Sequence, residues 1–259
     1  MRVRRADAGF SGREFCNTMR GDDAQTGRIM SRREALALFG AAGAALLAGR
    51  TPWSSAAEPA FTCFASPEQT EGPYFVDEKL NRPDIRSDPT DGSVRDGVAL
   101  TLTLVVSSVA RGKCAPLAGA VVDLWHCDAA GNYSGVKDLW GNTVGKKFLR
   151  GYQVTDAGGG VRFTTIYPGW YHGRTAHLHF KVRGTAGTKR GYEFTSQLYF
   201  DDALSDRMYS RHPYSRNGKR VLRNNADGIF RDSGSRMILP VVENGAGYSA
   251  NFNVGLQLT

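Results

Sequence analysis

The chain has 259 residues, of which 41% are hydrophobic and 10% aromatic, and this allows one domain with a substantial core plus a dispensable N-terminal region. The net charge is +8, and residues 1–57 already hold nine arginines against five acidic residues. The small surplus that remains, without a basic stripe interleaved with aromatic residues, argues against nucleic-acid binding.

Residues 30–57 predict a signal peptide. Arg32 and Arg33 precede an apolar stretch at 35–48, and small residues follow at 55–57, where a signal peptidase cuts. The stretch is shorter than the roughly 20 apolar residues of a membrane-spanning helix, so no stable membrane insertion is expected. The arginine pair resembles the twin-arginine signal and predicts export to the cell envelope, periplasm or exterior. A short amphipathic helix with an incidental arginine pair is the alternative.

Residues 1–29 are polar, rich in arginine and unlike any element that packs. Export signals usually begin near the initiator residue, so Met30 is a candidate start. We expect residues 1–29 to be disordered or not translated.

Three cysteines, Cys63, Cys114 and Cys127, follow the expected cleavage site, in a compartment that permits disulfides. Cys114 and Cys127 flank one strand-like run and form the candidate pair. Three buried thiols are the alternative, and the sequence leaves both open.

From residue 98 onward, short segments typical of β-strands follow one another. Residues 98–106 alternate apolar side chains with threonine, which is the period of a half-buried strand. The glycine-rich turn at 156–160 joins two such runs and predicts a hairpin. A short helix is predicted near 203–208, with Asp201 or Asp202 as its N-cap. The other predicted strands are 120–125, 151–155, 161–166, 177–182, 193–200, 237–242 and 248–258.

This pattern predicts an all-β fold, an antiparallel β-sandwich with irregular loops over residues 98–259. Residues 58–97 are rich in Pro, Asp and Arg. They are expected to form an extended N-terminal arm that lies across the sandwich.

Two histidines suggest a metal site. His177 and His179 are two apart in a predicted strand, so both imidazoles point to one face. Imidazole binds iron, zinc and copper, but such a pair also occurs at surfaces and in cores. The Pro-Gly turn at 168–169 can bring Tyr171 back over the histidines. A phenol has a pKa near 10, yet beside a trivalent cation it ionises and becomes a hard oxygen ligand that favours Fe(III).

Several ordered blocks resemble the intradiol ring-cleavage dioxygenases, the family of the protocatechuate and catechol dioxygenases. Each block is weak alone, but their order and spacing over roughly half the chain are specific. The blocks are TEGPYF at 70–75, PLAGAVVDLW at 116–125, DAAGNYS at 128–134, FLRG at 148–151, TDAG at 155–158, residues 168–179, and QLYF at 197–200.

The resemblance implies an Fe(III) cofactor and a reaction in which O2 opens a catechol between its hydroxylated carbons, giving a cis,cis-muconate-type dicarboxylate. Tyr171 would be an axial ligand that leaves the metal and takes a substrate proton. The pattern uses neither His126 nor His172 as a ligand. The implied metal ligands are Tyr133, Tyr171, His177 and His179; the implied residues beside the substrate are Arg174 and Gln197, with Gly72, Pro73 and Tyr74 at the pocket mouth.

Catechol enzymes of the family typically carry a large helical dimerisation domain, and protocatechuate enzymes pair two different chains. Here residues 58–97 are not helix-like, which points to a smaller, exported branch and leaves the preferred catechol and the oligomeric state open. The rival hypotheses are an exported β-sandwich binding module without redox activity, and a copper or zinc site. The absence of a carboxylate near His177 argues against zinc hydrolysis.

Overall fold

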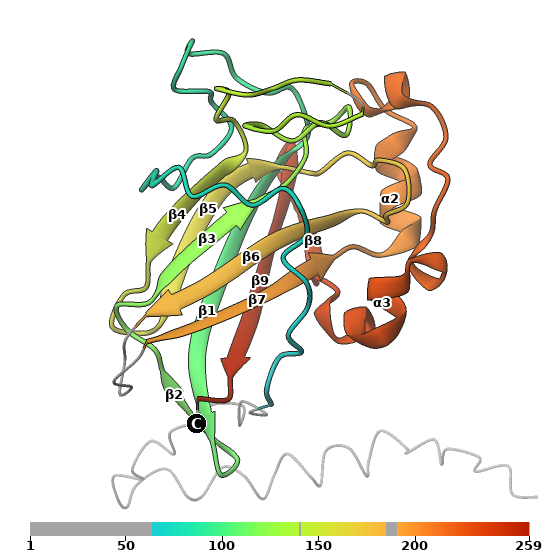
Figure 1. Cartoon of the computed structure of the whole chain (residues 1–259). Helices are drawn as coiled ribbons and strands as arrows, with labels where there is room; N and C mark the ends of the chain where they lie inside the picture. The colour runs from blue at the N-terminus through green and yellow to red at the C-terminus, as the bar shows by residue number, and fades with distance from the viewer. Residues whose placement is uncertain (1–63, 140, 185–190, 259) are drawn as a thin grey trace, which may run out of the picture. The chain divides into compact units, whose positions relative to one another are not determined.

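Two β-sheets form the centre of the computed structural model, which describes residues 64–139, 141–184 and 191–258 (Figure 1). The sequence predictions for residues 1–29 and 30–57, and for Cys63, lie outside these residues. The first sheet has the order β2-β1-β9-β8, with β5 also paired to β1, and the second has the order β4-β3-β6-β7. The strands are β1 (Ala99–Ala110), β2 (Lys113–Pro116), β3 (Val121–Trp125), β4 (Arg150–Val154), β5 (Gly160–Ile166), β6 (His177–Gly184), β7 (Tyr192–Tyr199), β8 (Val241–Asn244) and β9 (Gly247–Leu256).

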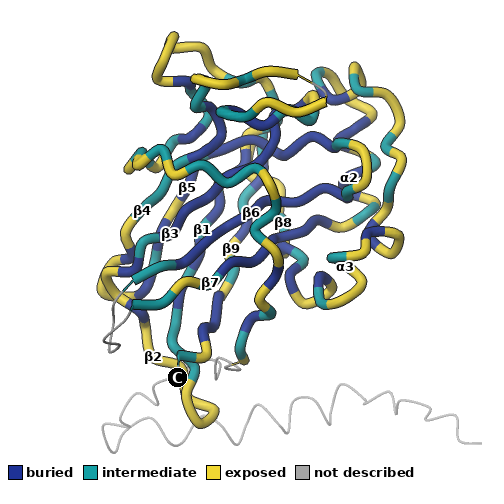
Figure 2. The backbone as a smooth tube through the Cα atoms, in the orientation of Figure 1, coloured by how far each residue is buried: buried dark blue, intermediate teal, exposed yellow. Residues whose placement is uncertain are grey.

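The core lies between the two sheets (Figure 2). On β1, Leu100, Leu102 and Leu104 are fully buried and alternate with half-buried threonines. On β6, by contrast, six successive residues from His177 onward are buried, including those that point away from the core. A strand buried on both faces needs a second cover, and the N-terminal arm provides it.

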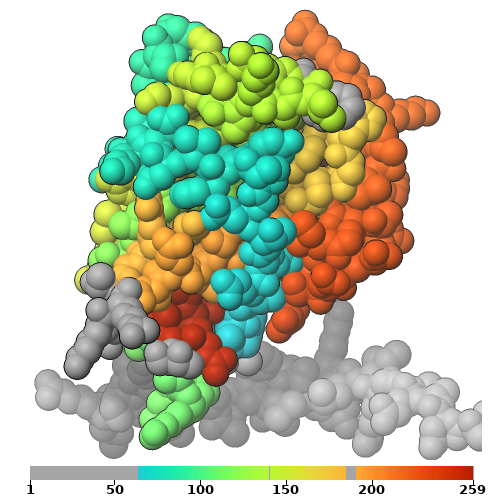
Figure 3. All heavy atoms as spheres, in the orientation of Figure 1, coloured from blue at the N-terminus to red at the C-terminus, as the bar shows by residue number. Residues whose placement is uncertain are grey.

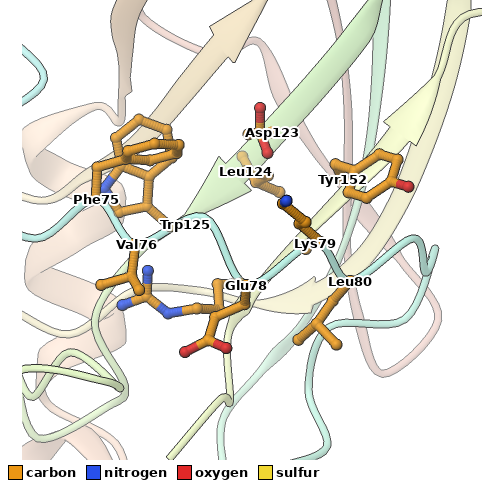
Figure 4. Close-up of a pocket in the computed structure, with 11 residues that line it drawn as sticks. Phe75, Val76, Glu78, Lys79, Leu80, Asp123, Leu124, Trp125 and Tyr152 are labelled. Atoms are coloured by element: carbon orange, nitrogen blue, oxygen red, sulfur yellow. The ribbon is translucent and has the colours of Figure 1, made fainter. Parts of the chain in front are cut away.

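The arm, residues 64–98, crosses the outer face of the second sheet (Figures 1 and 3). Backbone hydrogen bonds hold it at both edges: Gln69 N donates to Thr195 O on β7, and Tyr152 N on β4 donates to Leu80 O. Between these points Phe75 packs against Trp125 of β3, with ring centroids 4.8 Å apart (Figure 4). Ion pairs join Glu71 to Lys181, and Asp77 to Arg183, on β6.

The connection from β7 to β8 contains two helices and three short 3-10 turns. The helix α2 (Asp202–Tyr209) begins after Asp201, whose carboxylate accepts from the backbone N–H groups of Ala203 and Leu204. This confirms the predicted helix and its cap. None of the helices in the described ranges is long and apolar enough to cross a membrane. The remaining elements are η1 (Tyr214–Asn217), η2 (Asn224–Ala226), α3 (Gly228–Ser233) and η3 (Gly234–Met237).

The predicted hairpin at 151–166 is wrong. β4 pairs with β3 and β5 pairs with β1, so the turn between them crosses from one sheet to the other. Asp156 closes the turn by accepting from the N–H groups of Gly158 and Gly160. Gly159 then lies so close to β1 that a Cβ there would be 2.2 Å from Val106 O. The turn therefore docks on β1, and the chain continues in the first sheet.

The predicted all-β sandwich is confirmed, with a parallel pairing of β1 and β9 among its antiparallel strands. One further strand prediction needs correction. The strand expected at 237–242 begins only at Val241: Met237 ends a 3-10 turn, and Pro240 has no N–H to donate to a ladder. Leu239 N instead donates to Tyr199 O, which ties this segment to the end of β7.

The candidate disulfide between Cys114 and Cys127 is also wrong. Cys114 is disulfide-bonded, whereas Cys127 is a free, buried thiol. Cys114 lies on β2 in the first sheet and Cys127 follows β3 in the second, so the run that they flank passes from one sheet to the other.

Candidate metal centre

The four predicted metal ligands converge at the outer face of β6. His177 and His179 are both buried, and their Nε2 atoms are 3.0 Å apart. The hydroxyl of Tyr171, from the loop before β6, is 3.2 Å from His177 Nε2. The hydroxyl of Tyr133, from the loop after β3, is 3.4 Å from the same nitrogen. Three separate segments thus bring two phenols and two imidazoles to one point.

Close packing of two loops places the tyrosines. Asp128 Oδ1 accepts from the N–H groups of Ala130 and Asn132, which curls the chain just before Tyr133. Gly131 has a φ of 89°, and a Cβ there would be 2.5 Å from Trp170 O. Only glycine fits this contact, which brings the loop that carries Tyr133 against the loop that carries Tyr171.

The two histidines are held in different ways. His177 Nδ1 is 2.6 Å from Thr175 O, so this nitrogen carries the proton and Nε2 faces the phenols with its lone pair. His179 Nδ1 is buried and has no hydrogen-bond partner among the described residues. The His179 ring instead stacks on Trp125, its cross-strand neighbour, with centroids 5.0 Å apart and planes 10° apart. On the Nδ1 side, packing and not a hydrogen bond orients this imidazole.

We therefore expect Trp125→Leu to lower the affinity for Fe(III) by about 10- to 100-fold, the usual effect of losing a group that orients a ligand. Competition against a chelator would measure the affinity. Phe163→Leu is the matched control, because Phe163 is fully buried in the core from β5, in the first sheet. Equal affinities in the two variants would contradict the role of Trp125.

Burial keeps all four groups neutral in the metal-free protein. It lowers the pKa values of His177 and His179 well below 6.5, helped by the nearby charge of Arg174. Burial also raises the pKa values of Tyr133 and Tyr171 above the ordinary value of a phenol. Two nitrogen lone pairs and two ionisable phenols around one point fit a trivalent cation that prefers anionic oxygen. No group of three or more His, Cys, Asp or Glu in the described ranges is arranged so that it could hold a metal ion, so a four-ligand set here needs both tyrosines.

This arrangement predicts the pH dependence of metal binding. The imidazoles are already neutral, whereas each phenol must lose a proton to become a ligand, so loading one Fe(III) should release about two protons. Protons compete with the metal, and the apparent affinity should therefore rise with pH, by about a hundredfold per pH unit. Proton release in a weakly buffered titration, with the ultraviolet difference spectrum of tyrosinate, measures the number. Tyr133→Phe should release about one proton; an unchanged count would contradict Tyr133 as a ligand.

Arg174 and Gln197 lie beside the four converging side chains. Arg174 Nη1 is 3.3 Å from His177 Nε2, and Nη2 donates to Gln197 Oε1 over 2.5 Å. Gln197 is opposite His179 in the β6–β7 pairing, and its amide nitrogen donates to Thr70 O on the arm. Burial disfavours the charge of Arg174, but Tyr171 and Asp227 outweigh it and raise the pKa of the guanidinium.

The arm brings two of its three predicted residues to the centre. Gly72 has a φ of 73°, and a Cβ there would be 3.5 Å from His179 Cε1. The Tyr74 ring stacks on Tyr133, with centroids 4.3 Å apart, and its hydroxyl donates to Asp138 Oδ2. Pro73 is exposed. The arm therefore forms a wall over His179 and Tyr133.

Comparison with known proteins decides the family. A family model described as "Dioxygenase" matches residues 70–211. The solved structure of an intradiol ring-cleavage dioxygenase from Tetranychus urticae is 32% identical, with a TM-score of 0.65, over 75% of this chain and 95% of that chain. The chain belongs to the intradiol ring-cleavage dioxygenases.

Two further proteins are similar to this chain over different shares of their length. The dioxygenase domain of a dioxygenase–carbohydrate-binding protein fusion from Streptomyces sp. SirexAA-E is 30% identical, with a TM-score of 0.52, over 76% of this chain and 100% of that chain. A chlorocatechol 1,2-dioxygenase of Pseudomonas putida is 31% identical over 157 residues, which are 51% of this chain and 52% of that protein. The chain spans about half the length of the curated relatives that it matches.

Sequence reasoning missed three residues that build the site of this intradiol dioxygenase. Thr175 orients His177, Trp125 stacks on His179, and Asp227 binds Arg174. Asp227 stands before a short helix, and a search for N-caps would have found it there, but not its contact with an arginine 53 residues earlier. His126, which the family pattern does not use as a ligand, is bonded through Nε2 to Thr165 Oγ1 over 2.6 Å.

Proposed function

We propose that this chain is a non-haem Fe(III) enzyme that uses O2 to cleave a catechol-type diol between its hydroxylated carbons, yielding a cis,cis-muconate-type dicarboxylate. The observation that carries the proposal is the convergence of two phenols and two imidazoles. The hydroxyls of Tyr133 and Tyr171 and the Nε2 atom of His179 all lie within 3.4 Å of His177 Nε2. Membership of the intradiol family supports the reaction class. Tyr133, Tyr171, His177 and His179 would hold the metal.

Held by Tyr133, Tyr171, His177 and His179, Fe(III) would act as a Lewis acid and favour deprotonation of the catechol hydroxyls. The side chain of Tyr171 is half-buried and comes from a loop, so it can leave the centre and accept a substrate proton at its oxygen. Arg174 places a fixed positive charge beside His177, where it can stabilise negative charge that develops on the substrate. Tyr74 and Gly72 on the arm would orient the ring and exclude water.

The rival binding module lacks a comparable supporting observation. A surface that only binds a ligand has no need of two buried imidazoles with their Nε2 atoms 3.0 Å apart. The phenols also argue against a zinc hydrolase, which usually has a carboxylate base beside the metal.

A direct test is spectroscopic. Protein loaded with Fe(III) should be reddish, because tyrosinate bound to ferric iron absorbs strongly by charge transfer. A catechol added without oxygen should shift this absorption, and admitting 18O2 should restore it and give a ring-opened product that carries two labelled oxygens. A colourless protein that stays inert after reconstitution with ferric salt would overturn the proposal.

We also propose export through the twin-arginine route. Arg32 and Arg33 before the apolar stretch support it, and so does the disulfide at Cys114, because structural disulfides are rare in the cytosol. Replacing Arg32 and Arg33 by lysine should leave the uncleaved precursor in the cytosolic fraction, whereas Arg50→Lys should not. Export that persists in the double variant would contradict this route.

A further inference from the structure

We propose that Asp227 is a positioning residue that holds the guanidinium of Arg174 in place at the metal centre. The inference rests on the proposed function, because it assigns Asp227 a role in the reaction through Arg174. It also makes the short segment 224–227, which follows α2 and comes from neither sheet, part of the active site.

The carboxylate of Asp227 has two separate tasks, one on each oxygen. Its Oδ2 accepts from Arg174 Nε over 2.8 Å and from Thr175 N over 2.9 Å. Its Oδ1 caps α3 by accepting from the N–H groups of Ile229 and Phe230, over 2.9 and 3.1 Å. The side chain is fully buried, so no water competes for these bonds. One carboxylate thus joins the start of α3 to the loop that leads into β6.

All three nitrogens of the Arg174 guanidinium have a partner. Nε is held by Asp227, Nη2 by Gln197, and Nη1 faces His177 Nε2. A planar guanidinium with two of its nitrogens fixed cannot rotate, so the third nitrogen stays directed at the metal centre. The Gln197 Oε1 atom also accepts a hydrogen bond from the Tyr199 hydroxyl, and the Gln197 amide carries no charge. Asp227 is therefore the charged partner in direct contact with Arg174.

A second contact fixes the same loop. Thr175 Oγ1 donates to Asn224 Oδ1 over 2.6 Å, and Asn224 Nδ2 donates to Phe200 O over 2.8 Å. Thr175 is also the residue whose carbonyl orients His177. Asn224 therefore holds Thr175 through its hydroxyl, whereas Asp227 holds the Thr175 backbone N–H and the side chain of Arg174. The loop keeps the Asn224 contact when the bonds of Asp227 are changed by mutation.

The variant Asp227→Asn separates the contact that positions Arg174 from the contact that caps α3. Asparagine is as good an N-cap as aspartate, so its oxygen can keep the bonds to α3. Its amide NH2 would then face two donors, Arg174 Nε and Thr175 N, and the guanidinium would lose its charged partner. The matched control is Asp201→Asn, because Asp201 caps α2 in the same way and lies outside the metal centre.

We expect Asp227→Asn to keep its iron and lower kcat by up to about a hundredfold, the effect of misplacing a catalytic group by about 1 Å. KM should change less, and Asp201→Asn should keep the kcat of the unmutated protein. In a double-mutant cycle, adding Asp227→Asn to Arg174→Ala should lower kcat no further, since Asp227 acts through Arg174. A full additional loss in the Arg174→Ala background, or equal kcat in the two Asp→Asn variants, would overturn the inference.

A second measurement separates failure of this inference from failure of the proposed function. The Arg174 Nε–H resonance, assigned by its loss in Arg174→Ala, should exchange slowly in the unmutated protein and become fast-exchanging in Asp227→Asn. If the unmutated protein cleaves no catechol, the proposed function fails, and this resonance still decides whether Asp227 holds Arg174. An Nε–H that stays protected in Asp227→Asn would overturn the inference whatever the activity.

Discussion

Replacing Tyr171 with phenylalanine is expected to lower kcat by at least about a hundredfold while most of the iron remains bound. The lost oxygen is the group that would accept a substrate proton, and positioned proton transfer contributes about 10²- to 10⁴-fold to rates. Tyr133, His177 and His179 would still hold the metal, because their donor atoms reach the centre from β6 and from the loop after β3. Steady-state kinetics and iron content per chain are the measurements.

Tyr248→Phe is the matched control for this variant. Tyr248 is a buried tyrosine on β9, in the first sheet, and Tyr248→Phe tests what removal of a tyrosine hydroxyl costs outside the candidate site. Full activity in Tyr171→Phe would show that Tyr171 is neither the base nor a ligand that leaves the metal. A loss of iron in proportion to activity would instead make it a purely structural ligand.

Arg174→Ala is expected to lower kcat by about 10²- to 10³-fold, the usual effect of removing one group that stabilises charge in a transition state. Iron content should stay close to that of the unmutated protein, since a guanidinium has no lone pair to offer a metal and Arg174 is not one of the four proposed ligands. The loss should appear in kcat more than in KM.

Arg220→Ala provides the comparison for Arg174→Ala. Arg220 is also a buried, ion-paired arginine, bound to Asp202 and Asp206 of α2, so its removal breaks two ion pairs that involve none of the four proposed metal ligands. It should lower the melting temperature and leave kcat per iron unchanged. Parallel losses of iron and of kcat in Arg174→Ala would make Arg174 a structural residue.

The histidine pair could be predicted because it depends on local geometry alone. A period of two places His177 and His179 on one face of any strand, and the pairing of β6 with β7 places Gln197 opposite His179. Tyr133 has no such local signal. It lies in a loop, 44 residues before His177, and only the ordered family blocks indicated its place near the metal.

The wrong or missing predictions concern contacts between segments that are far apart in the sequence. The glycine-rich turn at 156–160 was recognised as a turn, but the turn residues do not determine which sheet the next strand joins. The parallel pairing of β1 with β9 joins residues about 150 positions apart and has no local pattern. Asp227 was missed for the same reason, because its partner Arg174 is 53 residues away.

The path of the arm has a consequence for the order in which the protein is made. Ser66, near the start of the described chain, donates from its backbone N–H to Gly255 O, and Gly255 N returns a hydrogen bond to Ser66 Oγ. The arm can therefore dock on β4 and β7 as soon as these strands have formed, whereas its contact at Ser66 must wait until β9 has been translated. The cover over the outer face of β6 thus forms in two steps, and β9 completes the second.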